Sequence, residues 1–309
     1  MKIRPEEYEK IKRETIRQAE MLAQINRMVP VSGERINLPL GDRTVEIVYY
    51  RSGQDPAPLI LGFHGGGFIF GGNAMDDAVW SSVSSRLSCH VASVGYRQGP
   101  DHQWRASLAD AYDTAVYMRD HAEEFGIDPG QISVMGNSAG GCIAASVCLY
   151  ANQKGTLSFA NQILMYPVLD LKTDPAEKGE GTIDGPMMYL SNEFRCKKEE
   201  AGLSLVSPLF ASDEELKGLP NTILCLADTD SLKAEGIAYG KRLKEAGIPT
   251  ADAVYEHMPH AFFEYGFGNV PEQAYTVLGE AARPLVENGS IAESSQKALA
   301  FVAEHFRRK

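Results

Sequence analysis

Residues 131–150 read QISVMGNSAGGCIAASVCLY, and this stretch decides the fold. It contains G-x-S-x-G at Gly136–Gly140, between the apolar run Ile132–Met135 and the helix-forming run Gly141–Tyr150. This strand–turn–helix context is the one in which the motif carries a nucleophile. A sharp turn exposes the serine at a helix N-terminus, where the dipole and N–H groups favour negative charge, provided that the flanking positions lack side chains. We therefore predict Ser138 as a nucleophile.

Short apolar runs recur on both sides of this stretch and alternate with helical patterns. Because continuous apolar strands separated by helices are buried on both faces, the pattern predicts an α/β fold with a mostly parallel central sheet and helices on both faces. The chain of 309 residues is expected to form a single domain. The expected strands are 44–50, 58–63, 90–95, 131–135, 162–166, 222–227 and 253–255, and the expected helices are 5–29, 106–125, 139–150, 232–246, 272–285 and 291–306.

One segment breaks the alternation. Residues 173–194 read TDPAEKGEGTIDGPMMYLSNEF and show no strand pattern. Long insertions of this kind often cover a site, so we expect residues 173–205 to lie over one end of the sheet.

Composition restricts the partners. The chain has 30 Lys+Arg and 41 Asp+Glu, which gives a net charge of −11 and argues against nucleic acid or an anionic membrane surface as the main partner. No apolar run approaches the roughly 20 residues of a membrane span, and the charged N-terminus has no apolar signal region. The five cysteines include no C-x-x-C pair, so we expect buried thiols in a cytoplasmic protein.

A glycine run follows the predicted strand 58–63. His64–Gly67 reads HGGG, which removes every side chain from a short arc and lets backbone N–H groups approach a ligand oxygen. HGGG accompanies the G-x-S-x-G turn in lipases and esterases, so we predict an oxyanion hole from the N–H groups of Gly65, Gly66 and Ala139. A phosphate-binding loop is the alternative, but no G-K-[ST] follows. His64 is expected to order the loop.

The base should follow the serine and the acid in the chain, because this fold uses the order Ser, Asp or Glu, His. His257, His260 and His305 remain after Ser138. His305 lies in the terminal helical pattern, where a solvated face is expected. His260 opens His-Ala-Phe-Phe, similar to the His-Gly-Phe with which such a base begins a helix, so we favour it over His257.

Two aspartates compete for the acid. The predicted strand 222–227 is followed by Asp228 and Asp230, and either could reach an imidazole Nδ1. We favour Asp230, because a position slightly beyond the strand end points back more easily. Asp228 would then serve as a helix N-cap near 231–234. The acid would fix the tautomer of the base and stabilise its imidazolium.

Apolar side chains near these motifs could line an acyl or alcohol pocket, although each could equally belong to the core. Those at 68 and 70 adjoin the glycine run. The candidates are Phe68, Phe70, Trp80, Met187, Met188, Tyr189 and Phe262.

Together these motifs resemble the hormone-sensitive-lipase family of esterases, also called bacterial family IV, over about residues 59–263. Residues 96–102 (YRQGPDH) are similar to Tyr-Arg-Leu-Ala-Pro-Glu-His, residues 166–170 (YPVLD) and Ser207-Pro208 also fit, and Asp230 stands where the family has Asp-Pro-Leu. The resemblance implies an α/β-hydrolase fold with a cap from about 1–35 and 173–205. It also implies hydrolysis of short- to medium-chain carboxylic esters without metal or cofactor, and dimers through a sheet edge in many members.

The chain departs from the family pattern at four positions. Asn137 replaces an acidic residue before the nucleophile, Ser231 and Arg105 stand where prolines are common, and Ala261 replaces the glycine after the base. No catalytic group is lost, but the substrate class stays open. Deacetylation of carbohydrates or amide hydrolysis would use the same residues. A non-catalytic small-ligand receptor, as in some plant relatives that lose the histidine, is the alternative from another class.

Overall fold

A computed structural model describes residues 4–181, 185–268, 270 and 278–306. Its centre is one sheet of eight strands in the order β1-β2-β4-β3-β5-β6-β7-β8. β1 and β2 are antiparallel, as are β2 and β4, and every other pair is parallel. The mostly parallel sheet is confirmed. The strands are β1 (Glu34–Leu40), β2 (Arg43–Tyr50), β3 (Ala57–Phe63), β4 (His90–Val94), β5 (Ile127–Asn137), β6 (Asn161–Met165), β7 (Asn221–Ala227) and β8 (Thr250–Tyr255).

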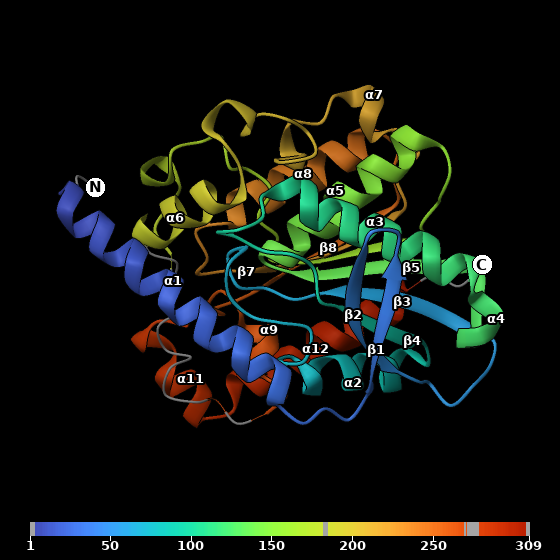
Figure 1. Ribbon diagram of the computed structural model, residues 1–309. Helices are drawn as coiled ribbons and strands as arrows, with labels where there is room; N and C mark the ends of the chain where they lie inside the picture. The colour runs from blue at the N-terminus through green and yellow to red at the C-terminus, as the bar shows by residue number, and fades with distance from the viewer. Residues whose placement is uncertain (1–3, 182–184, 269, 271–277, 307–309) are drawn as a thin grey trace.

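Helices cover both faces of this sheet (Figure 1). α3, α5 and α8 enclose one core cluster with the sheet, and α2 and α12 enclose the other. Of the expected helix 272–285, residues 272–277 lie outside the described residues, and residues 280–285 form a 3₁₀ turn followed by the start of α11. The helices are α1 (Pro5–Met28), α2 (Asp77–Leu87), α3 (Trp104–Asp120), α4 (Ala122–Phe125), α5 (Ala139–Lys154), α6 (Gly185–Arg195), α7 (Asp213–Leu216), α8 (Lys233–Glu245), α9 (Phe262–Tyr265), α11 (Arg283–Glu287) and α12 (Ser290–His305), with 3₁₀ turns at Pro175–Glu177, Lys198–Glu200, Pro208–Phe210 and Glu280–Ala282.

The elements absent from the sequence-based expectation include one strand of the sheet, β1, and one helix that packs against it, α2. β1 lies at an edge of the sheet, has mixed burial and contains Pro39, so its sequence ERINLPL lacks a clear strand alternation. α2 contains four serines, which weaken the helical pattern of its apolar positions. Both form because tertiary contacts outweigh weak local preference.

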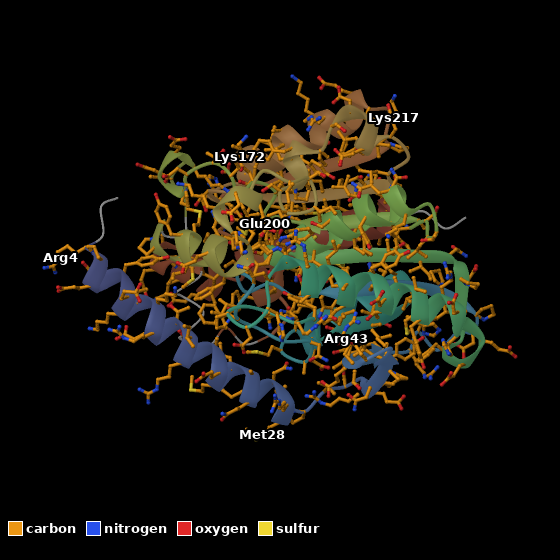
Figure 2. All side chains as sticks on the ribbon, turned by 45° about the horizontal axis from the view of Figure 1, so that its top comes forward. Arg4, Met28, Arg43, Lys172, Glu200 and Lys217 are labelled. Carbon is orange, nitrogen blue, oxygen red and sulfur yellow. The ribbon has the colours of Figure 1, made fainter. Side chains whose placement is uncertain are left out.

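α1 and α6 form a separate contact outside the two main clusters. Glu193 of α6 accepts hydrogen bonds from Tyr8 (2.6 Å) and Lys12 of α1. Apolar residues of both helices pack with Ile69 and Phe70, which follow the glycine run. α1 extends along the outside of the molecule from Arg4 to Met28 (Figure 2). The assignment of 1–35 and 173–205 as a cap stays a prediction, and the described part of 173–205 contains no strand.

All five cysteines are buried thiols. Among the described residues, no helix has the length and apolar character needed to cross a membrane.

Candidate active site

Ser138 lies at the turn between β5 and α5 and occupies the N-cap position of α5. Its φ of 53° and ψ of −116° are unusual for a residue with a side chain and carry strain. The turn needs glycine on both sides: a Cβ at Gly136 would lie 2.1 Å from the carbonyl oxygen of Gly140, and one at Gly140 would lie 2.0 Å from that of Phe63. The predicted strand–turn–helix geometry is present.

The predicted base reaches the serine, and the predicted acid reaches the base. His260 follows β8, and its Nε2 lies 2.8 Å from Ser138 Oγ. Its Nδ1 lies 2.6 Å from Asp230 Oδ2. The carboxylate can only accept, so Nδ1 carries the proton and Nε2 is free to accept from the serine hydroxyl. The other oxygen of Asp230 accepts from the N–H of Leu232 at 2.9 Å, which holds the carboxylate in place.

Burial and charge act in opposite directions on His260. Burial of the ring lowers the pKa of His260. The charge of Asp230 and its hydrogen bond to Nδ1 together raise the pKa by more than burial lowers it, so the pKa lies above its ordinary value. The imidazolium form is therefore stabilised in this site. That is the electrostatic setting that a general base paired with a buried aspartate requires.

The competing candidates lie elsewhere. His257 is exposed, and its backbone N–H donates to Asp228 at 3.2 Å. Asp228 forms an ion pair of 3.0 Å with Lys233 and does not cap a helix, so the expected N-cap role is wrong. The N-cap of α8 is Leu232, and five residues, 228–232, separate the end of β7 from the first residue of the helix.

The glycine run lies beside the serine. A Cβ at Gly65 would be 3.6 Å from Ser138 Cβ, and Gly66 and Gly67 have φ of 112° and 60°. A Cβ at Gly66 would lie 2.3 Å from the carbonyl oxygen of Phe70. Only glycine fits this path, and the path brings the loop backbone up to the nucleophile.

His64 orders this loop. Its Nδ1 donates to the carbonyl of Gly65 at 2.7 Å, and its ring stacks on Tyr96 with centroids 4.4 Å apart. The hydroxyl of Tyr96 donates to the carbonyl of His64 at 2.8 Å. Burial lowers the pKa of His64 to about 4, so the ring is neutral near pH 7. Among the described residues, the hydrogen bonds of His64 are to Gly65 and Tyr96 and not to Ser138, His260 or Asp230.

The predicted pocket residues fall into two groups. Phe68 belongs to the core cluster under α3 and α5, and Trp80 and Phe262 belong to the opposite one, where the indole covers Gly62. Phe70 is half-buried in the contact between α1 and α6, and Met188 is buried on α6 itself. Met187 and Tyr189 also lie on α6, and a substrate contact for any of the seven candidates stays a prediction.

Sequence reasoning missed two residues beside the base. The ring of Tyr166 meets that of His260 edge-on, with centroids 5.0 Å apart. The Tyr166 hydroxyl donates to Glu264 of α9. Glu264 lies on the short helix that follows His260, four residues further along the chain, and this closeness in sequence was the available signal.

Metal ligands do not gather at this site. Within the described ranges, no group of three or more His, Cys, Asp and Glu could hold a metal ion.

Comparison with known proteins identifies the family. Residues 60–264 match a family model described as the alpha/beta hydrolase fold. The arylesterase of Saccharolobus solfataricus is 31% identical over 226 residues, which cover 72% of either chain. Esterase LipI of Mycobacterium tuberculosis is 31% identical over 223 residues, 71% of this chain and 69% of the relative. The chain belongs to the hormone-sensitive-lipase-like esterases of the α/β-hydrolase family.

The solved structure of an ester-hydrolase agrees with the fold. The ester-hydrolase EH1AB1 from the metagenome of Lake Arreo superposes with a TM-score of 0.77 at 26% identity, over 93% of this chain and 90% of that one. The chain is therefore a serine hydrolase of the carboxylesterase class.

Proposed function

We propose that this esterase hydrolyses carboxylic esters with short- to medium-length acyl chains, by acyl transfer to Ser138. The observation that carries the proposal is the continuous hydrogen-bonded series Ser138–His260–Asp230, with 2.8 Å and 2.6 Å between the paired atoms. It stands at the N-terminus of α5, beside a loop built of glycines.

Acylation begins when Ser138 Oγ attacks the ester carbonyl carbon and His260 Nε2 takes the hydroxyl proton. The carbonyl oxygen becomes an oxyanion, which the N–H groups of Gly65, Gly66 and Ala139 would bind. A single donor of this kind contributes about 3–4 kcal/mol. His260 then gives its proton to the leaving alcohol, the bond from carbon to alcohol oxygen breaks, and the acyl group remains on Ser138.

Deacylation repeats the sequence with water. His260 takes a proton from water as the water oxygen attacks the acyl carbon, and the proton then passes to the departing Ser138 Oγ. Asp230 holds Nδ1 protonated and stabilises the imidazolium in both steps. The free acid leaves, and the enzyme returns to its starting state.

An organophosphonate that traps serine nucleophiles tests the assignment. We expect one adduct per chain, mapped to Ser138 by peptide mass spectrometry, and none in S138A. H260N should abolish labelling, whereas H257N, at an exposed histidine nearby, should label like the unmodified enzyme. An adduct elsewhere, or none, contradicts the proposal.

A substrate panel tests the acyl range. We expect the highest kcat/KM on p-nitrophenyl esters of two to about eight carbons, because Phe70 and Met188 would bound the acyl site under α6. Acetylated xylo-oligosaccharides and aryl amides belong in the same panel. A higher kcat/KM on either would favour deacetylation or amide hydrolysis, and binding without turnover would favour a receptor.

A further inference from the structure

We propose that Glu264 is a positioning residue of this site, whose carboxylate stabilises the imidazolium form of His260 beside the ring of Tyr166. The proposal rests on the role of His260 as base. It concerns a carboxyl group that the mechanism above does not use.

Glu264 reaches the centre of the site from α9. Its Oε1 lies 3.3 Å from the point that a Cβ on Gly65 would occupy, and Ser138 Cβ lies 3.6 Å from the same point. The carboxyl group therefore approaches the glycine loop on the side where the loop meets the nucleophile. A carboxylate this close to the site changes the energy of the charged groups that form during the reaction, including the imidazolium of His260.

Tyr166 fixes the carboxyl group next to the base. Its hydroxyl donates to Glu264 Oε2, and its ring meets the ring of His260 at 63°. Tyr166 itself is held in an unusual backbone conformation, with φ of 35°, by its N–H bond of 2.7 Å to Cys225. Strain of this kind persists only where the surroundings enforce it, and it often marks functional positions.

The charges around His260 are mostly negative. Asp230 contacts Nδ1 directly, and the negative charges of Glu264 and Glu235 also raise the pKa of His260. Around Glu264, the neighbouring titratable groups are Tyr166, Tyr265, Asp76, Asp230 and His260. Burial raises the pKa of Glu264, and burial with the charge of Glu264 raises the pKa of Asp76 to about 8.

An ionised Glu264 is bonded to the tyrosine whose ring contacts His260, so its negative charge favours the imidazolium. The effect is reciprocal: formation of the imidazolium favours the carboxylate, and the carboxylate favours the imidazolium. The base therefore becomes stronger when Glu264 is charged.

E264Q tests this charge without removing the acceptor for Tyr166. We expect the acid limb of the kcat/KM profile to move to lower pH by about half a unit or more, because loss of a nearby negative charge lowers the pKa of His260. The plateau should fall by about three- to tenfold, since the base is weaker. Y166F, which releases the carboxyl group, should move the limb in the same direction.

The controls separate charge from structure. E264D keeps the charge, so its limb should lie closer to that of the unmodified enzyme than the limb of E264Q does. E256Q removes an exposed carboxylate just after β8 and should leave the limb in place. If folded E264Q and Y166F keep the original limb, the proposal is wrong even where their rates fall. Absence of a phosphonate adduct in the unmodified enzyme would instead refute the proposed function.

Discussion

Asp230 contacts the imidazole of His260 at 2.6 Å, whereas Asp228, two residues earlier, faces Lys233 at 3.0 Å. The two carboxylates leave the same strand end and have entirely different partners. We expect D230N to lower kcat/KM by about 10³-fold or more, because an amide no longer fixes the tautomer of the base. D228N, the matched control, should stay within about threefold. Comparable losses in both variants would contradict the assignment of the acid.

Gly66 provides a test of the oxyanion loop. G66A places a Cβ 2.3 Å from the carbonyl oxygen of Phe70, so the loop must shift away from Ser138. We expect kcat to fall more than about 100-fold, the effect of losing one oxyanion donor. Gly41 is the control: its φ of 68° is also positive, but a Cβ there meets nothing within 4 Å. G41A should cost about 1–2 kcal/mol of stability and leave kcat unchanged.

The contact between α1 and α6 should influence substrate entry more than stability. Glu193 and Lys12 are partly exposed, and such ion pairs contribute about 1 kcal/mol or less. We expect E193A to change the KM for a long acyl ester by about two- to fivefold with little change in kcat. E14A, which removes an exposed carboxylate paired with Lys10 along α1, should leave KM unchanged. Identical KM values in both variants would argue against a cap role for α6.

His64 should make the fold sensitive to acid. Burial lowers its pKa from 6.5 to about 4, so the folded state binds fewer protons than the unfolded state between these values. The free energy of unfolding therefore falls as the pH is lowered through this window, by up to about 2 kcal/mol between pH 7 and pH 5. Urea unfolding of H64N should show a smaller loss over the same range. H121N, at an exposed histidine, controls for the removal of one histidine and should keep the slope of the unmodified enzyme.

The local features of the site could be predicted from sequence because steric demands act within a few residues. Gly136 and Gly140 mark the turn around Ser138, and each would clash with backbone if substituted. The base and acid required more: chain order reduced the histidines to three, and resemblance to a family favoured Asp230. The two residues could be chosen without knowing any distance between them.

Long-range relationships could not be predicted in this way. Tyr166 and Glu264 meet across 98 residues, and nothing in either local sequence indicates the partner. Trp80 has the chemistry of a pocket residue, but its position on α2 turns it toward Gly62 in the core. The face of the sheet that Trp80 reaches is set by α2, a helix that the sequence pattern did not predict.

The buried thiols give this enzyme built-in reporters of its motions. Burial raises the pKa of Cys196 to about 11 and that of Cys225 to about 12, so a thiol-reactive dye at pH 8 must wait for each site to open. Cys196 directly follows α6, while Cys225 lies within β7. If the dye labels Cys196 faster than Cys225, the labelling rate of Cys196 measures local opening of α6 separately from global unfolding, with no engineered label.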